Sequence, residues 1–379
     1  MDSFQPSNYI RIVNKDQVVN LPDIAPIETW WPGSTHPYII SGPCSAETEE
    51  QMLSTAAQLH QKGHVHLFRA GIWKPRTRPN SFEGVGEIGL HWLAEVKKQF
   101  GFKTTVEVAN ANHVELALKY GVDVLWIGAR TTVNPFSVQE IADALQGTDT
   151  PVFIKNPINP DLQLWIGGIE RIYSAGIRKI GAIHRGFSYH GESIYRNKPM
   201  WEIPIALMAQ MPNLPLFGDP SHISGKRELL SSVGQKALDL GMKGLMIESH
   251  INPDEAWSDA KQQVTPEALS QLLNGFQLRD TQSANQDFTD RLNDLRQKID
   301  QVDEEIIKLI GERMKISEEV GRYKKENKIT ILQLERYKEI IRTRTEWARK
   351  MGLTEEFIEI YLEQLHKESI RTQTRVMNQ

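Results

Sequence analysis

Short apolar runs rich in β-branched residues recur along the first part of the chain, and each precedes a polar or glycine-bearing loop and a helical stretch. Their spacing of roughly 25–40 residues is typical of β–α units. Eight such runs within about 240 residues predict a closed (β/α)8 barrel, because an open doubly wound sheet would usually have fewer strands. The predicted strands are Tyr38–Ser41, His66–Ala70, Thr104–Val108, Val124–Gly128, Val152–Lys155, Ile180–His184, Leu214–Gly218 and Gly244–Glu248.

The pattern on either side of the barrel is different. Before it, Ile10–Val13 and Gln17–Leu21 flank a polar tripeptide and predict a small hairpin, either a lid for the barrel floor or an oligomer contact. After Pro266, the last of the 19 prolines, a charge-rich segment with few glycines predicts long helices. The predicted domains are an N-terminal extension (1–29), the barrel (30–275), a polar linker (276–288) and a helical domain (289–379).

The helical domain begins with a heptad seam, because its apolar positions alternate in steps of three and four. They are Leu292, Leu295, Ile299, Val302, Ile306, Leu309, Ile316 and Val320. The predicted helix, Thr289–Glu326, is too long to bury its seam alone, so we expect at least a dimer through this domain. Arg313 interrupts the seam, and Lys324 falls on nearly the same helix face. Periodicity alone leaves open a plain coiled-coil tail, in which Arg313 sets the register and Lys324 is solvated.

Composition narrows the classes of function. Hydrophobic residues make up 40% and charged residues 24%, which fits folded domains and argues against disorder. A net charge of −4 argues against a protein built mainly to bind nucleic acid or anionic membrane, and no apolar run approaches the ~18 residues of a membrane span. Cys44 is the single cysteine, so no internal disulfide is possible and a reducing cytoplasm is the expected location.

Six cations lie at or just after the carboxyl ends of the predicted strands, where the chemistry of such a barrel takes place. They are Arg69, Lys74, Arg76, Arg130, Lys155 and Arg185. Because like charges repel, a cluster of this kind is favourable only when anions fill it. The sequence therefore predicts substrates that carry phosphates or carboxylates, and these cations converge on a pocket rather than on a nucleic-acid stripe.

A second group at the strand ends offers ligands for a metal. Cys44, His222 and Glu248 follow or end strands, and Asp259 lies in the last loop. Thiolate, imidazole and carboxylate together suit one divalent ion such as Mn²⁺, Fe²⁺, Co²⁺ or Zn²⁺, with an open position for water or a substrate oxygen. Taken singly, each residue has a more common explanation, such as a buried small side chain, a helix cap or a surface ion pair. Their recurrence at one end of successive strands favours a site.

The strand-end motifs resemble those of 3-deoxy-D-arabino-heptulosonate 7-phosphate (DAHP) synthase, in the compact microbial subtype of type I. The resemblance covers roughly residues 30–275, in order. The motifs are Gly42-Pro43-Cys44-Ser45, Arg69-Ala70-Gly71, Lys74-Pro75-Arg76-Thr77, Gly128-Ala129-Arg130, Lys155-Asn156-Pro157, His184-Arg185-Gly186, Asp219-Pro220-Ser221-His222 and Ser258-Asp259-Ala260. The family condenses phosphoenolpyruvate with erythrose 4-phosphate, the entry step of aromatic biosynthesis.

The resemblance implies a role for each motif residue. Cys44, His222, Glu248 and Asp259 would bind the metal. Arg69, Lys74 and Lys155 would hold the phosphoenolpyruvate carboxylate; Arg130 and Arg185, with backbone near Ala129, its phosphate; and Arg76 and Thr77 the erythrose phosphate. Lys74 would also give a proton to the new hydroxyl, and Glu107 would orient the attacking water. A related barrel, 3-deoxy-manno-octulosonate 8-phosphate synthase, has a Lys-Ala-Asn-Arg type of loop, so Lys74-Pro75-Arg76-Thr77 favours the shorter sugar.

The helical domain resembles the all-helical chorismate mutases, a family of dimeric three-helix domains. The motifs are Leu295–Asp300, Glu312-Arg313, Glu319–Lys324, Glu335-Arg336 and Ser369 to Gln373. The implied site is Arg296, Arg313, Lys324, Arg336 and Gln373, with Arg296 supplied by the partner chain. Arginines would clamp the two carboxylates of chorismate, while Lys324 and Gln373 would reach its ether oxygen as it rearranges to prephenate. Where some members carry acidic residues, this chain has Gln333 and Tyr337.

These resemblances together predict a bifunctional enzyme, a metal-dependent synthase fused to a chorismate mutase. Since the two reactions are not consecutive, regulation is the better reason for the fusion, with chorismate or prephenate sensed by the tail as feedback. The alternatives are a monofunctional synthase whose tail only dimerises and binds ligand, and the octulosonate synthase.

Overall fold

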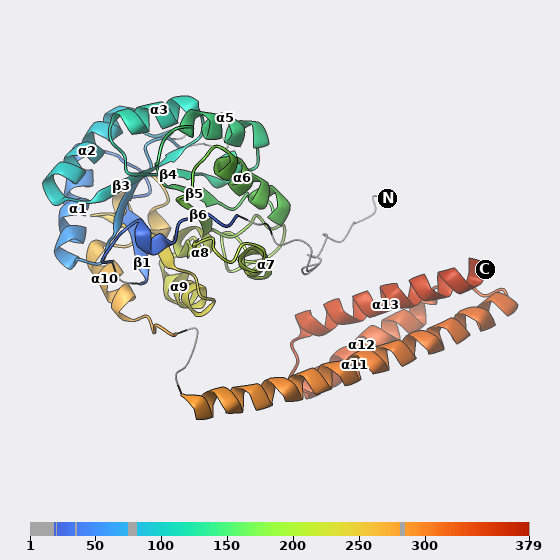
Figure 1. Ribbon diagram of the computed structural model, residues 1–379. Coiled ribbons are helices and arrows are strands. Elements are labelled where there is room, and N and C mark those ends of the chain that lie inside the picture. Colours follow the sequence, from blue (N-terminus) through green and yellow to red (C-terminus); the bar gives the residue numbers. More distant parts are fainter. Residues whose placement is uncertain (1–18, 20, 35, 75–81, 281–284, 379) are drawn as a thin grey trace. The chain divides into compact units, whose positions relative to one another are not determined.

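The computed structural model describes residues 19, 21–34, 36–74, 82–280 and 285–378, and the chain forms two compact units, Met1–Thr281 and Gln282–Gln379 (Figure 1). In the described part of the first unit, eight parallel strands close into a barrel in sequence order, with β8 pairing to β1. The predicted (β/α)8 barrel is confirmed. The strands are β1 Tyr38–Gly42, β2 Leu67–Ala70, β3 Lys103–Val108, β4 Val124–Ile127, β5 Val152–Lys155, β6 Ile180–His184, β7 Leu216–Gly218 and β8 Gly244–Glu248.

Helices surround these strands (Figure 1). Polar side chains begin several of them; Thr48 and Asp161, for example, accept hydrogen bonds from the backbone N–H groups of Gln51 and Leu164. The helices are α1 Glu49–Lys62, α2 Ile88–Phe100, α3 Ala111–Lys119, α4 Ala129–Thr132, α5 Pro135–Leu145, α6 Leu162–Ser174, α7 Glu202–Gln210, α8 Pro220–Ser224, α9 Leu230–Asp239 and α10 Pro266–Asn274. Between successive strands, one or two helices return the chain to the start of the next strand, and since all strand pairs are parallel the strand carboxyl ends share one face.

Alternation along the strands decides which side chains lie inside the barrel. Residues two apart in a strand share a face. On three strands, an inward apolar residue deep in the barrel is followed two positions later by an inward charged residue nearer the carboxyl end. Such pairs are Leu67 and Arg69 on β2, Phe153 and Lys155 on β5, and Met246 and Glu248 on β8. Trp30 closes the apolar layer, with its ring centroid 5.2 Å from that of Phe153. The apolar layer provides packing, and the polar layer above it is available for chemistry.

The described part of the second unit consists of three helices, as predicted: α11 Gln286–Glu326, α12 Leu334–Lys350 and α13 Glu355–Asn378. Helix α11 ends at the predicted residue, but it begins at Gln286 because the Asn285 side chain caps it, accepting from the backbone N–H of Phe288. Helix α13 packs along the C-terminal half of α11, where a Cβ on Gly321 would lie 3.1 Å from the Cα of Gln373. Glycine therefore permits this close approach.

The heptad seam of α11 lies exposed within this unit. Ile299, Ile306 and Leu309 are 59%, 43% and 63% exposed. A continuous apolar stripe of this kind is unfavourable in water and marks an interaction surface.

Two further predictions concern the N-terminal hairpin and the absence of a membrane-spanning helix. The predicted N-terminal hairpin falls almost entirely outside the described residues. Among the helices of the described residues, none is both long enough and apolar enough to cross a membrane.

Candidate active sites

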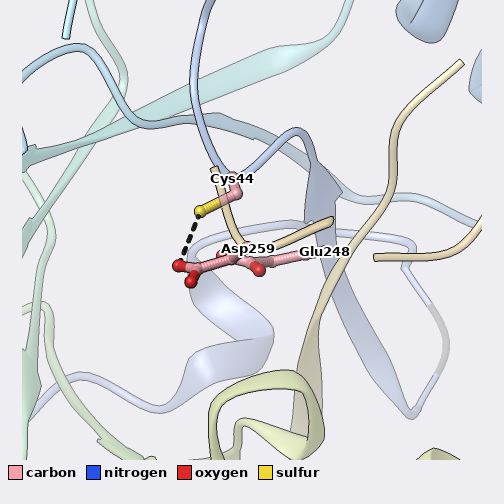
Figure 2. A group of neighbouring side chains, drawn as sticks. All are labelled: Cys44, Glu248 and Asp259. Atoms are coloured by element: carbon pink, nitrogen blue, oxygen red, sulfur yellow. Dashed lines mark hydrogen bonds between the residues drawn. The ribbon is translucent and has the colours of Figure 1, made fainter. Parts of the chain in front are cut away.

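Cys44, Glu248 and Asp259 come together at the carboxyl end of the barrel, from the loop after β1, the end of β8 and the loop after β8 (Figure 2). One donor atom from each residue lies within 4.8 Å of the others, and the Cys44 Sγ is 3.3 Å from Oδ2 of Asp259. Cys44 and Glu248 are fully buried, and Oε1 of Glu248 has no hydrogen-bond partner among the described residues. A thiol and two carboxylates, one of them buried and with an oxygen that accepts no hydrogen bond from the described residues, form a donor set that fits a divalent transition metal.

His222, the fourth predicted ligand, lies beside this group. Its Nε2 is 3.7 Å from Oε1 of Glu248, and its Nδ1 is 2.8 Å from Oδ2 of Asp219. Burial is the main cause that lowers the pKa of His222, which favours the neutral imidazole that a metal requires. Asp219 precedes α8 and is buried, so it can orient the ring as carboxylates orient metal-binding histidines.

Lys74 contacts the same group of metal-donor residues, through Cys44. Its Nζ donates to the Cys44 Sγ at 3.0 Å. Burial, followed by the charge of Glu248, raises the pKa of the Cys44 thiol to about 12. Arg76 and Thr77, predicted to bind the second phosphate, lie outside the described residues.

Two buried cations, Arg69 and Lys155, lie over the ring of Trp126 at 5.0 Å and 5.8 Å from its centroid. Each has a buried carboxylate partner: Arg69 Nη1 is 3.2 Å from Oε1 of Glu248, and Lys155 Nζ is 2.8 Å from Oδ2 of Asp219. An unpaired buried charge is strongly unfavourable, so these ion pairs make it possible to keep two cations inside the barrel.

Glu107 is held against the same tryptophan. Its Oε2 accepts a hydrogen bond from Nε1 of Trp126 at 3.1 Å. A Cβ on Gly128 would lie 1.9 Å from Oε1 of Glu107, so only glycine leaves room for this carboxylate. The carboxylate that we predicted to orient water therefore lies within the polar layer of the barrel.

Arg185 lies just after β6 and is held by side-chain and backbone acceptors. Its Nη1 donates to Oδ1 of Asn197 at 2.8 Å and to the carbonyl oxygen of Gly186 at 3.3 Å. Burial, and then the neighbouring cations Arg196 and Arg130, lower its pKa to about 10, so it remains charged at neutral pH. Arg130 is exposed on α4, one residue after Ala129. Arg130 is therefore close enough to Arg185 for its charge to contribute to the lowered pKa of Arg185.

Sequence reasoning missed four residues that contact this group: Arg196, Asn197, Gln262 and Gln263. Arg196 and Asn197 lie on the loop between β6 and α7, and the glutamines follow Asp259 in the last loop. Gln263 accepts from the backbone N–H of Cys44 at 2.9 Å and donates to the carbonyl oxygen of Ser258 at 2.8 Å. The available signal was a pair of consecutive glutamines, three and four residues after the predicted ligand Asp259.

In the helical domain, Arg313 of α11 reaches toward α13. Its Nη1 donates to Oγ of Ser369 and, at 3.4 Å, to the carbonyl oxygen of Leu365. Ser317, one turn along α11, lies 3.3 Å from the same Ser369 hydroxyl. Arg313 also lines a cavity of about 450 Å³ together with Arg336 and the ring of Trp347.

The other four predicted mutase residues differ in their contacts and in their exposure. Lys324 donates to the carbonyl oxygen of Ile331 at 2.5 Å, and burial lowers its pKa. Gln373 is buried, and its Oε1 has no hydrogen-bond partner among the described residues. Arg336 donates to Glu339 at 2.7 Å and Arg296 is exposed.

The two residues that depart from the mutase pattern lie near the start of α12. Gln333 is exposed, and the ring centroid of Tyr337 lies 4.5 Å from that of His366 on α13. One of the two departures from the mutase pattern, Tyr337, therefore packs against an imidazole of α13.

Comparison with known families gives two matches, one for each unit. The family described as "DAHP synthetase I family" matches residues 23–283, and the family described as "Chorismate mutase type II" matches residues 295–374. The first match covers well over half of the chain, and the second covers most of the helical domain.

Individual relatives match the barrel. A Thermotoga maritima protein named phospho-2-dehydro-3-deoxyheptonate aldolase is 30% identical over 259 residues, which are 68% of this chain and 72% of the relative. A 2-dehydro-3-deoxyphosphooctonate aldolase of Vesicomyosocius okutanii is 28% identical over 263 residues, or 65% of this chain and 91% of the relative. A crystal structure of the DAHP synthase of T. maritima superimposes with a TM-score of 0.57 and 30% identity, covering 62% of this chain and 67% of that one.

Proposed function

The chain belongs to the DAHP synthetase I family, and we propose the residues by which its barrel makes DAHP from phosphoenolpyruvate and erythrose 4-phosphate. The second domain, of the type II chorismate mutase family, rearranges chorismate to prephenate. The observation that carries the proposal is the juxtaposition of the Cys44, Glu248 and Asp259 donors with the buried cations Arg69 and Lys155. The free thiol suits a reducing compartment, and we expect the protein to work in the cytoplasm.

The cations divide between the two anionic groups of phosphoenolpyruvate. Arg69, Lys74 and Lys155 bind its carboxylate, and Arg130 and Arg185 bind its phosphate with the backbone near Ala129. Arg76 and Thr77 bind the phosphate of the sugar. Two substrates held in this way have their reacting carbons adjacent, which replaces a bimolecular encounter by a preorganised one.

The reaction forms one carbon–carbon bond and one carbon–oxygen bond, the latter from water, and breaks the carbon–oxygen bond to the phosphate. The enol carbon of phosphoenolpyruvate attacks the aldehyde carbon, and Lys74 gives a proton to the aldehyde oxygen as it becomes a hydroxyl. Water, oriented by Glu107, adds to the carbon that bears the phosphate. Phosphate then leaves with the bridging oxygen.

A divalent metal ion fits the donor set of Cys44, His222, Glu248 and Asp259, and the buried Glu248 carboxylate and the neutral imidazole of His222 support its binding. When bound, such an ion supplies Lewis-acid polarisation of the aldehyde oxygen. Mn²⁺, Fe²⁺, Co²⁺ and Zn²⁺ all suit these ligands.

In the helical domain, Arg313 and Arg336 hold the carboxylates of chorismate, and Lys324 and Gln373 stabilise the charge that develops on its ether oxygen. The Oε1 of the buried Gln373, which has no hydrogen-bond partner in the described part of the chain, supports a site that substrate completes. The exposed seam of α11 supports a homodimer, in which Arg296 of one chain reaches the site of the other.

The test of the synthase assignment uses metal-stripped full-length protein. Adding one divalent ion at a time to phosphoenolpyruvate and erythrose 4-phosphate should restore DAHP formation in proportion to bound metal. Mutase turnover in the same sample should not change, which controls for intact protein. Arabinose 5-phosphate should be a poor substitute; preference for it would favour the octulosonate reaction.

We also propose feedback by prephenate on the barrel. Added prephenate should lower the synthase rate of the full chain, and Arg313→Ala should weaken this inhibition because it weakens binding to the helical domain. No inhibition, or equal inhibition of both proteins, would remove the regulatory role.

A further inference from the structure

Two adjacent residues on the loop between β6 and α7, Arg196 and Asn197, contact both parts of the barrel site. One part is the metal-donor group, and the other is Arg185, to which we assigned a phosphate. Neither residue is among those that we propose to bind substrate or metal.

Arg196 contacts one of the donors directly and a second through Gln262. Its Nη1 donates to Oδ1 of Asp259 at 2.9 Å and to Oε1 of Gln262 at 2.7 Å. The buried Gln262 in turn donates from Nε2 to Oε2 of Glu248 at 2.7 Å. Because Oδ1 of Asp259 is engaged by the guanidinium, its other oxygen faces the Cys44 Sγ at 3.3 Å. Arg196 therefore sets the rotation of this carboxylate.

Asn197 joins Arg185, on the phosphate side, to the backbone of the segment that carries His222. Its Oδ1 accepts from Nη1 of Arg185 at 2.8 Å, and its Nδ2 donates to the carbonyl oxygen of His222 at 2.6 Å. Its own backbone N–H donates to the carbonyl oxygen of Ile223 at 3.1 Å. A shift of this asparagine would move Arg185 and the segment that carries His222 together.

The local backbone is built for this arrangement. Gly186 has a φ of 77°, and a Cβ on it would lie 2.6 Å from the carbonyl oxygen of Asn197. The loop therefore passes so close to the end of β6 that only glycine fits there. Asn197 is 9% exposed, so its amide is shielded from competing water.

We propose that Arg196 and Asn197 are positioning residues that set the spacing between the metal donors and the phosphate-binding arginine. This inference rests on the proposed function of the barrel. Arg196 orients Asp259 and, through Gln262, Glu248, while Asn197 holds Arg185 in register with His222. The aldehyde and the enol carbon react only when held at bonding approach, so an error in this spacing affects the chemical step.

The first arm of the test measures metal binding without turnover. Full-length, metal-stripped protein is titrated with Co²⁺, and binding is followed by the thiolate-to-cobalt absorption of Cys44. Arg196→Gln should weaken Co²⁺ binding about 10- to 100-fold, the usual effect of losing a residue that orients a metal ligand. Arg196→Lys, which can still reach Asp259 but cannot also bridge Gln262, should fall between that variant and the wild type.

The second arm measures phosphoenolpyruvate binding by calorimetry. Asn197→Ala should weaken it about tenfold, because Arg185 loses its neutral acceptor and its fixed orientation. Arg196→Gln should change it much less. The matched control is Arg171→Gln, which removes a 2.8 Å bond from an arginine to Gln139 between outer helices α6 and α5, and it should change neither quantity.

The outcomes separate the two levels of inference. Wild-type Co²⁺ affinity in Arg196→Gln, or wild-type phosphoenolpyruvate affinity in Asn197→Ala, would overturn the positioning role while leaving the proposed function intact. Failure of the wild type itself to bind Co²⁺ or phosphoenolpyruvate would overturn the proposed function and this inference with it. Equal losses of both ligands in every variant would indicate a general structural role and would also overturn the inference.

Discussion

The barrel and the helical domain assemble their charged sites in opposite ways. In the barrel, one chain encloses them, so that Arg69, Lys155 and Glu248 are 2%, 4% and 0% exposed. In the helical domain, Arg313 and Lys324 are partly exposed, and the seam along α11 is open. The candidate residues of the barrel are therefore enclosed by one chain, whereas those of the helical domain and its apolar stripe remain partly or fully exposed within one chain.

The difference follows from what each architecture can pair. A closed barrel directs side chains from several strands into one interior, so each buried cation can find a buried carboxylate. Three helices offer fewer convergent positions, and Arg313 and Lys324 rely on a hydroxyl and on backbone carbonyls instead. Burial without a counter-charge would be unfavourable, so these cations remain near the surface.

Removing one buried counter-charge from the barrel should have the largest effect. Asp219→Ala leaves Lys155 buried without its partner and should lower the free energy of unfolding by about 3–5 kcal/mol. Urea unfolding followed by tryptophan fluorescence measures it, since eight of the nine tryptophans lie in the barrel. In the helical domain, Glu339→Ala removes the exposed partner of Arg336 and should change the free energy of unfolding, followed by circular dichroism, far less. Similar costs in both domains would contradict the contrast.

Arg313→Ala should separate the two activities. Loss of a positioned charge donor should lower kcat/KM for chorismate about 10²- to 10³-fold and leave the DAHP rate unchanged. Arg322→Ala, an exposed arginine of the same helix, is the matched control and should keep full mutase activity. A parallel fall in both activities would show that the sites are not independent.

A charge on the open seam should affect only the helical domain. Ile306→Glu should raise the dimer dissociation constant at least about 30-fold, equivalent to about 2 kcal/mol for a lost buried isoleucine. Mutase activity should then fall on dilution while DAHP formation per chain does not. Gln297→Glu places the same charge on the opposite side of α11 and should leave sedimentation unchanged; a monomeric wild type would refute the predicted dimer.

The same contrast explains how far sequence reasoning reached. Apolar runs predicted all eight strands, and the residues at their ends predicted the donors and cations that the barrel brings together, because parallel strands end on one face. Arg196, Asn197 and Gln262 could not be predicted in this way, since the path of a loop depends on contacts with residues distant in sequence. For α11, periodicity predicted its end at Glu326, but Asn285 in the polar stretch before it moved its beginning.

The smallest expected effect is on the pH dependence of stability. It compares a buried histidine of the barrel with a histidine on an exposed loop. Burial among Trp165, Phe187 and Trp201 lowers the pKa of His184 to about 3. Below the ordinary histidine value of about 6.5, the unfolded chain binds a proton that the folded barrel does not, so stability falls as pH decreases from there toward 3.

His184→Phe removes the contribution of this histidine to the pH dependence of the free energy of unfolding. Between pH 6.5 and 5.5, the wild type should lose about 1 kcal/mol more free energy of unfolding than the variant, approaching 1.4 kcal/mol for each further pH unit. Urea unfolding at a series of pH values measures the difference in slope, which is independent of any repacking cost of the larger ring. His190→Phe, on an exposed loop, should keep the wild-type slope. Equal slopes for wild type and His184→Phe would mean that the layer between β6 and the outer helices admits the proton, and that this layer is less enclosed than the burial of His184 indicates.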